Sequence, residues 1–171
     1  MEELFVSHEN LLILGAGQFG VMVKEIAESI NCFAKISFLD DFSEQAIGKI
    51  GDYALFADEY QCAIVAIGNP TLREKFIQDL VDFGFKVPSL ISPYACVFSS
   101  ASVGKGSIVE PMATVQSNAT LGDGCIVSSG AVVRHNAVVG AFCHLDCNSV
   151  ALSYAEIPQK TKVSCCQIYP S

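Results

Sequence analysis

The chain contains 171 residues, carries a net charge of −8 at neutral pH and has no tryptophan. An acidic chain offers no basic patch to a nucleic-acid backbone, so we expect no nucleic-acid binding. It has no stretch of about eighteen consecutive apolar residues and no basic start, so neither a membrane span nor a secretory signal is expected.

The eight cysteines predict a cytoplasmic location. Without a secretion signal, thiols stay reduced and usually act as small buried hydrophobic residues. Segment 143–147 (CHLDC) and the pair Cys165-Cys166 are the two groups that resemble metal ligands. Neither has the C-x-x-C spacing of a zinc module. We therefore expect no bound metal.

A nucleotide-binding turn is predicted near the start of the chain. The apolar run 11–14 ends in the sequence GAGQFG at 15–20, and a helical pattern follows. A second strand, 35–39, ends in Asp40 and Asp41. In this order of elements, glycines let backbone N–H groups approach a phosphate at a helix N-terminus, and an acid holds a ribose hydroxyl. The alternative is a glycine turn that serves only helix–sheet packing.

A third buried strand is expected at 62–67, followed by a helix that Thr71 caps and that runs to about residue 83. Three or four strands are too few for a full dinucleotide domain, which favours a mononucleotide such as a UDP group over NAD. Ligands of such sheets bind beyond the carboxyl ends of the strands. The predicted substrate-binding residues are Gly15, Gly17, Gln18, Asp40, Asp41, Gly68 and Asn69.

The rest of the chain repeats with a period of six, which is the hexapeptide pattern of a parallel β-helix. Each hexad forms one face of a triangular coil and points its aliphatic residue inward. We therefore predict an α/β domain at residues 1–90 and a short parallel β-helix at 91–171. The residues in register are Ile91, Val97, Val103, Val109, Val115, Leu121, Val127, Val133, Val139, Leu145, Ala151, Ile157 and Val163.

The repeat predicts about four coils of eighteen residues. Gly104, Gly122 and Gly140 share this spacing, so we expect them to stack at one corner and to adopt positive φ. After Leu152 the pattern weakens, and the last residues, 165–171, are expected to form a terminus instead of a coil. Four coils bury a narrow core and leave flat faces, so a homotrimer is expected.

The two halves together resemble the sialic acid O-acetyltransferase family, which includes bacterial UDP-amino-sugar N-acetyltransferases. The resemblance rests on the hexads and on segments 12–17, 38–41, 67–70 and 130–135. It implies an N-terminal domain that binds a nucleotide sugar. It also implies that the β-helix is left-handed and trimeric and that it binds acetyl-CoA between neighbouring subunits.

The same resemblance implies roles for four residues of the β-helix. His135 acts as the general base on the sugar amine or hydroxyl, with Asn136 beside it. His144 lies near the CoA thioester, and the backbone N–H of Ser153 faces the thioester oxygen. Imidazole titrates near neutral pH and suits this proton transfer. The reaction requires no covalent enzyme intermediate.

Two other functions stay open at this point. Asn136 stands where the family usually has an acid, Ser153 stands where it often has glycine, and the repeat ends early, which favours a non-catalytic sugar-nucleotide-binding relative. An NAD-linked oxidoreductase is the third possibility, and the short sheet argues against it. We favour an acetyltransferase that acts on a nucleotide-linked amino sugar.

Overall fold

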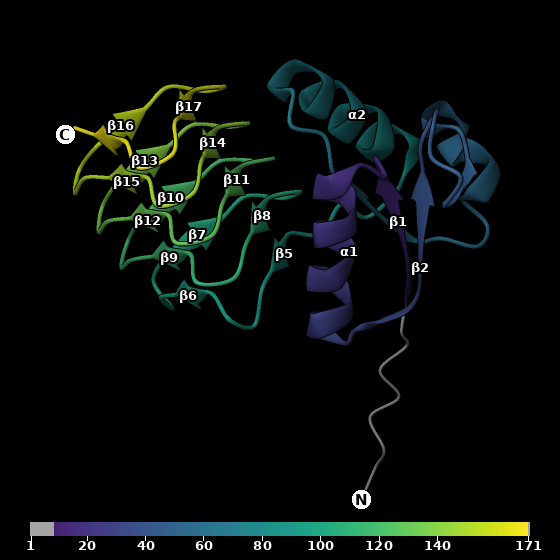
Figure 1. Ribbon diagram of the computed structural model, residues 1–171, viewed down its shortest axis with the longest axis horizontal. Helices are drawn as coiled ribbons and strands as arrows, with labels where there is room; N and C mark the ends of the chain where they lie inside the picture. Colours follow the sequence, from purple (N-terminus) through teal and green to yellow (C-terminus); the bar gives the residue numbers. More distant parts are fainter. Residues whose placement is uncertain (1–8, 171) are drawn as a thin grey trace, which may run out of the picture.

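The computed structural model describes residues 9–170, which form an α/β unit and a β-helix side by side (Figure 1). The α/β unit has a parallel sheet of β1 (Glu9–Leu14), β2 (Phe33–Leu39), β3 (Ala46–Gly48) and β4 (Cys62–Val65), in the order β3-β2-β1-β4. Residues 11–14 of β1 and all four residues of β4 are apolar because both faces of the sheet are covered there.

Helices cover both faces of this sheet. Helix α1 (Gln18–Ile30) packs on the face that carries Leu11 and Ile13, whereas α2 (Pro70–Phe83) and the short 3₁₀ helix η1 (Ile50–Phe56) cover the opposite face. The cap of α2 is Asn69 and not Thr71 as predicted. The Asn69 side chain accepts hydrogen bonds from the N–H groups of the next helical residues, whereas Thr71 is itself one of these donors.

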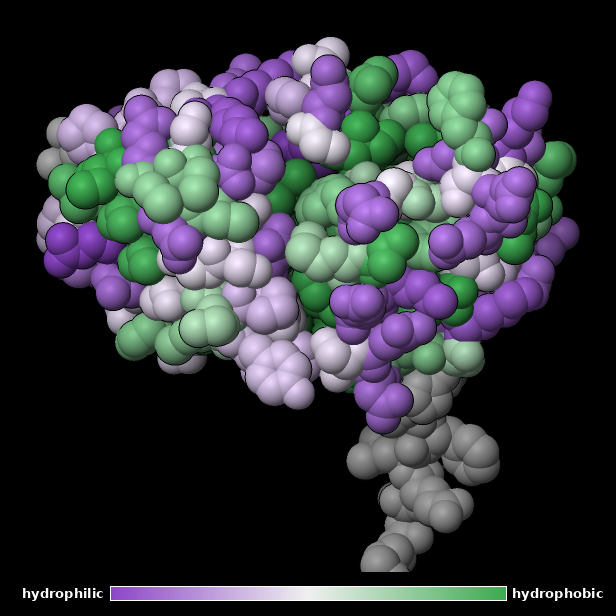
Figure 2. Space-filling model, in the orientation of Figure 1, coloured by the Kyte–Doolittle hydropathy of each residue, from purple (hydrophilic) through white to green (hydrophobic). Residues whose placement is uncertain are grey.

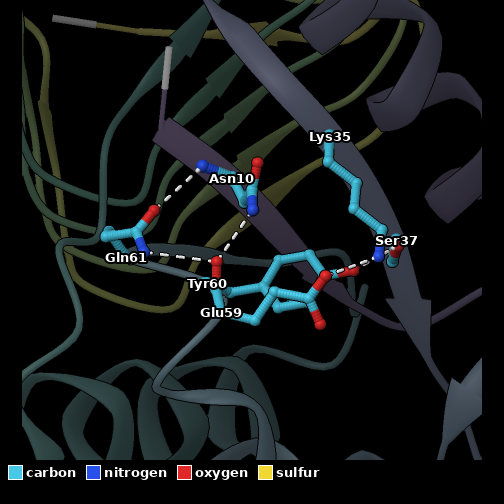
Figure 3. A network of polar contacts seen from close by, with 6 residues as sticks. All are labelled: Asn10, Lys35, Ser37, Glu59, Tyr60 and Gln61. Carbon is cyan, nitrogen blue, oxygen red and sulfur yellow. Dashed lines mark hydrogen bonds and ion pairs between the residues drawn. The ribbon is translucent and has the colours of Figure 1, made fainter. Parts of the chain in front are cut away.

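A polar network closes the amino-terminal end of the sheet, away from the predicted site (Figure 3). Asn10 donates through its side-chain amide to the Glu59 carbonyl at 2.8 Å, and the Tyr60 hydroxyl donates to Ser37 Oγ at 2.6 Å. Tyr60 is buried, so this bond satisfies a hydroxyl that would otherwise be unpaired inside the core. The network ties the loop before β4 to β1 and β2.

The β-helix consists of two-residue strands that form three parallel sheets (Figure 1). We name them by their first strands: the β5 sheet, the β6 sheet and the β7 sheet. Each strand pairs with the strand eighteen residues further on, as in the pair Thr120 and Val138. The strands are β5 (Leu90–Ile91), β6 (Cys96–Val97), β7 (Ser102–Val103), β8 (Ile108–Val109), β9 (Thr114–Val115), β10 (Thr120–Leu121), β11 (Ile126–Val127), β12 (Val132–Val133), β13 (Val138–Val139), β14 (His144–Leu145), β15 (Val150–Ala151), β16 (Glu156–Ile157), β17 (Lys162–Val163) and β18 (Ile168–Tyr169).

The predicted left-handed β-helix of hexapeptide repeats is confirmed, and its aliphatic residues fill one continuous core. The prediction that the last residues, 165–171, form a terminus instead of a coil is wrong, because Ile168 and Tyr169 pair with β15. Strands β16, β17 and β18 continue the three sheets, which hold four, five and five strands and thus make between four and five coils. Pro158 is tolerated because it follows the edge strand β16, where no ladder bond needs its missing N–H.

The glycines of the repeat form two groups with different roles. The positive φ predicted for the first group, Gly104, Gly122 and Gly140, is found instead in a second group. Gly104, Gly122 and Gly140 stack so closely that a Cβ on Gly104 would lie 2.4 Å from the Gly122 carbonyl carbon. Positive φ occurs two residues later, at Gly106 (+67°) and Gly124 (+61°). The first group is therefore required by coil spacing, and the second by the backbone turn.

The two units share a buried interface. Helix α1 packs against Leu90 and Ile108 of the β5 sheet, which belong to the same apolar cluster as the α/β core. Figure 2 shows apolar surface where the two lobes meet. On the other side of the sheet, the fully buried Arg73 of α2 donates to the carbonyls of Gly124 (2.7 Å) and Phe142 (2.8 Å) at β-helix corners.

Arg73 also donates to the carbonyls of Ile67 and Gly68 in the loop after β4. Four carbonyls therefore depend on one guanidinium.

Arg73→Met keeps the apolar stem and leaves these four carbonyls unpaired, so we expect a loss of at least about 3 kcal/mol of unfolding free energy. Denaturant unfolding measures it. Lys75→Met on the same helix removes an exposed ion pair with Asp79 and an exposed contact with the Phe76 ring, and it should change little. Equal midpoints for the two variants would contradict the role of Arg73.

Candidate functional site

A cavity of about 410 Å³ lies where the glycine turn meets the β-helix. Its apolar wall comes from α1 and β11, and its polar wall from His144 of β14 and from residues that directly follow strands of the β5 sheet. Because both units contribute, the Arg73 contacts that dock them also define its shape. The lining residues are Gln18, Phe19, Met22, Gly68, Glu110, Ile126, Ser128, His144, Asp146 and Cys147.

The glycine turn directs the start of α1 toward this cavity. Gly15 has φ +109°, and a Cβ on Gly20 would lie 2.1 Å from the Gly15 carbonyl oxygen, so both positions require glycine. Gly17 is the N-cap and provides no side chain to pair with the first helical N–H groups. Those groups and the positive end of the helix dipole make the start of α1 suited to an anion.

Asp40 organises this turn from within and does not line the cavity. Its carboxylate accepts hydrogen bonds from the N–H groups of Ala16 (2.8 Å), Phe42 (2.9 Å) and Ser43 (3.0 Å). These bonds, with the one from Ala16 first, hold the pKa of Asp40 below its usual value. Asp41 accepts from the Ile50 N–H at 3.2 Å. Both acids thus bind the protein's own backbone in this structure.

On the β-helix side, His144 and two carboxylates face the cavity. His144 Nε2 lies 3.1 Å from Ser128 Oγ, and burial lowers the pKa of the imidazole. Glu110 is buried and accepts two bonds from Ser129. Asp146 pairs with Lys162 at 2.9 Å, and this partner lowers the pKa of the carboxyl. The cavity therefore combines an imidazole of lowered pKa with two carboxyl side chains.

His135 lies at a different corner, between β12 and β13. Its Nδ1 is 2.9 Å from Asn136 Nδ2, and its Nε2 is 2.9 Å from Ser153 Oγ. The Tyr154 ring stands edge-on to the imidazole, with centroids 5.6 Å apart. The backbone N–H of His135 donates to Gln116 Oε1 at 3.1 Å. Both ring nitrogens are thus held by neutral side chains.

The structure divides the predicted site residues into separate groups. Gln18, Gly68 and His144 meet at the cavity, whereas Asn69 caps α2 and Gly15 and Gly17 form the turn behind it. His135, Asn136 and Ser153 form the second group at the β12–β13 corner.

Sequence reasoning missed the polar column of Glu110, Ser128 and Asp146 as well as Gln116 and Tyr154. The column repeats at the coil length of eighteen, and the same spacing puts Ser153 one coil after His135. The eighteen-residue spacing is the sequence signal from which the polar column could have been predicted. Within residues 9–170, no three His, Cys, Asp or Glu side chains converge as a metal site. None of the helices in this range is long and apolar enough to cross a membrane.

The lowered pKa of His144 predicts a pH dependence of stability. The folded pKa lies below the unfolded value of about 6.5, so the unfolded state takes up the proton first. The contribution of neutral His144 is complete above that value and decreases as the pH falls toward the folded pKa. We expect the stability difference between wild type and His144→Gln to shift in favour of the variant between pH 7 and 5. Parallel stability curves over this range would contradict the prediction.

Two family models match the chain. The model described as the PglD N-terminal domain matches residues 10–80, and the bacterial transferase hexapeptide model, of six repeats, matches residues 100–135. The first match covers the sheet with its glycine turn, and the second ends at His135.

Solved structures match over nearly the whole chain. The acetyltransferase domain of PglB from Neisseria gonorrhoeae FA1090, in complex with acetyl coenzyme A, is 27% identical with a TM-score of 0.76, over 94% of this chain and 98% of that one. PerB from Caulobacter crescentus, in complex with CoA and GDP-perosamine, is 24% identical with a TM-score of 0.76, over 95% and 86% of the two chains. WeeI from Acinetobacter baumannii AYE is 18% identical with a TM-score of 0.75, over 90% and 74%.

PerB and WeeI support the fold, and PglB adds the kind of reaction. The matched repeat is that of bacterial transferases, and the PglB domain of the same fold is an acetyltransferase. The chain is therefore an acyltransferase with a PglD-like N-terminal domain and a hexapeptide-repeat β-helix.

Proposed function

We propose that the chain is an acetyl-CoA-dependent acetyltransferase that acts on a UDP-linked amino sugar in bacterial glycan biosynthesis, with His135 as general base. The observation that carries this proposal is the imidazole at the β12–β13 corner. Its Nδ1 is held by Asn136, and its Nε2 points at a hydroxyl 2.9 Å away. A base with one nitrogen fixed and the other directed at an O–H or N–H group is arranged for proton transfer. The eight free cysteines support a cytoplasmic location.

The nucleotide sugar would bind in the cavity at the start of α1, between the proposed domain of residues 1–90 and the β-helix. The unpaired N–H groups of the helix start suit a phosphate, and Gly68 leaves room beside them. The four-stranded sheet supports a mononucleotide over NAD. PerB was solved with a GDP sugar, so the choice of UDP is tested by comparing binding of UDP and GDP sugars.

His135 serves as base in the tautomer that carries its proton on Nδ1. Asn136 then turns its carbonyl oxygen toward Nδ1, and Nε2 has a free lone pair. The acceptor amine loses its proton to Nε2 as it attacks the acetyl carbonyl. Asn136 orients the ring but adds no charge to stabilise the imidazolium. In a serine-protease triad, asparagine in place of the aspartate costs about ten-thousand-fold in rate, because the histidine is then held in the wrong tautomer. An amine needs less activation than a hydroxyl, so we favour N-acetylation.

A homotrimer would bring the two groups of site residues together. The cavity adjoins one edge of the β6 sheet, and His135 lies at its other edge. The outward face of this sheet carries Val132, Val150 and Ile168, whereas the β5 sheet is covered by α1. Contact through the β6 sheet would cover this apolar face and bring His135 of one subunit near the cavity of the next.

This arrangement predicts different effects for two surface valines. Val150→Glu introduces a charge into the proposed contact, so we expect the trimer to dissociate and acetyl transfer to fall with it. Val138 points outward from the β7 sheet and is 48% exposed, so Val138→Glu should leave the assembly intact. Sedimentation velocity measures both. If Val150→Glu stays assembled, the β6 sheet is not the interface.

His135→Ala should reduce acetyl transfer by about 100-fold to 10,000-fold, the usual range for loss of a general base. Binding of acetyl-CoA and of the UDP sugar should remain, because neither requires the base. Turnover assays and isothermal titration calorimetry measure the two properties. A variant with unchanged turnover would remove His135 from the mechanism.

A non-catalytic sugar-nucleotide-binding relative is the second candidate. The neutral Asn136 favours it, because it cannot stabilise an imidazolium by charge. Calorimetry with acetyl-CoA separates the two candidates. Micromolar binding supports the enzyme, whereas sugar-nucleotide binding without acetyl-CoA binding supports the second candidate.

A further inference from the structure

Glu110, which lines the cavity of about 410 Å³, has one carboxyl oxygen that the protein does not use. The side chain is 5% exposed, and both of its hydrogen bonds, from the N–H and the hydroxyl of Ser129, end on Oε2. Within residues 9–170, the one buried side-chain nitrogen or oxygen without a hydrogen-bond partner is Ser149 Oγ. Glu110 Oε1 is therefore not enclosed by protein, and it is accessible from the cavity that the residue lines.

No cation pairs with Glu110 in the part of the chain that the structure describes. The ion pairs there join lysines to other acids. One of these acids is Asp146, which lines the same cavity and pairs with Lys162 at 2.9 Å. A buried acid without a cation is costly, and a positively charged ligand group offsets that cost. Of the two acids that line the cavity, Glu110 is thus the one left to pair with a ligand.

The two walls of the cavity favour opposite charges. Gln18 and Gly68 lie at the start of α1, where unpaired N–H groups suit a phosphate. Glu110 and Asp146 follow β8 and β14 on the β-helix side, and their carboxyl groups disfavour a phosphate there. A ligand that is anionic at one end and carries a cationic donor at the other matches both walls. A nucleotide-linked amino sugar has this polarity.

We propose that Glu110 binds the amine of the acceptor sugar and makes the site selective for amino sugars over the corresponding hydroxyl sugars. The inference rests on the proposed function, because it takes the nucleotide sugar to be the ligand of this cavity. Oε1 accepts a hydrogen bond from the ammonium form of the amine, while Oε2 keeps its bonds to Ser129. A sugar hydroxyl is an uncharged donor, and a hydrogen bond between two charged groups is the stronger one.

Acetyl transfer remains direct in this arrangement. The bound ammonium first releases one proton to solvent, and the resulting amine attacks the acetyl carbonyl. His135 takes the second proton as the C–N bond forms and the C–S bond breaks, and this proton then passes to the CoA thiolate. The products are the acetamide, the CoA thiol and one proton, so atoms and charges balance. The acetamide is uncharged, so the ion pair with Glu110 distinguishes substrate from product.

Three variants isolate the free oxygen of Glu110. Glu110→Gln keeps the shape of the side chain, and its amide oxygen still accepts from Ser129, but an N–H donor replaces the free acceptor. Glu59→Gln removes the same charge at the amino-terminal end of the sheet, where Glu59 forms an exposed pair with Lys35. Asp146→Asn removes the acid that already has a cation. Thermal unfolding checks that each variant folds.

The experiment measures, by calorimetry on the full chain at neutral pH, the binding of UDP-glucose and of its three analogues with an amine in place of the C2, C3 or C4 hydroxyl. We expect wild type and Glu59→Gln to bind one amino sugar at least about tenfold more tightly than UDP-glucose. Glu110→Gln should lose this preference and keep the wild-type affinity for UDP-glucose. Asp146→Asn should retain most of the preference.

Two results would overturn the proposal: equal affinities of wild type for all four UDP sugars, or a preference for the amine that survives in Glu110→Gln. Loss of the preference in Asp146→Asn alone would assign the amine to the other acid and overturn the role of Glu110. The proposed acetyl transfer fails separately. If the preference depends on Glu110 but the preferred sugar is not acetylated, the amine subsite stands and the chain is the non-catalytic relative. If none of the four UDP sugars binds, the sugar-nucleotide site and this inference are both wrong.

Discussion

The arrangement of the molecule depends on one buried cation, Arg73. Among residues 9–170 it has no carboxylate partner, and its charge is balanced by carbonyl dipoles from two corners of the β-helix and from the loop after β4. Burial lowers the pKa of the guanidinium, but arginine remains charged in proteins. Because the same side chain holds Gly68 and the β-helix corners, it fixes the two walls of the 410 Å³ cavity relative to each other.

This docking constrains the corner that receives α2. A Cβ on Gly124 would lie 3.1 Å from Ile77 Cδ1, and one on Gly106 would lie 2.9 Å from the same atom. These glycines therefore serve the approach of α2 as well as the positive φ of the turn. Further along the same corner, Phe142 packs beside this helix and Lys160 pairs with Glu74. The residues of the corner change as α2 passes over successive coils.

The sequence predicted the periodic features well because periodicity reflects burial, which acts on every coil alike. The glycine turn, the strands of the sheet and the hexads are of this kind. The sequence could not predict that Arg73 docks the two units. Its partners lie up to 69 residues away and are backbone carbonyls, which carry no sequence signal. Asp40 was found at the correct turn. The sequence could not indicate that the Asp40 carboxylate already accepts hydrogen bonds from the N–H groups of Ala16 and Phe42.

The coil length of eighteen residues explains how such a small fold builds its candidate sites. A residue gains neighbours one coil before and one coil after it, so a mutation at one position changes the environment of a side chain eighteen residues away. Ser153 illustrates this effect, because a glycine there would leave His135 Nε2 without its present partner. The chemistry at His135 is therefore set as much by residue 153 as by its sequence neighbour Asn136. Substitutions one coil apart have to be interpreted as pairs.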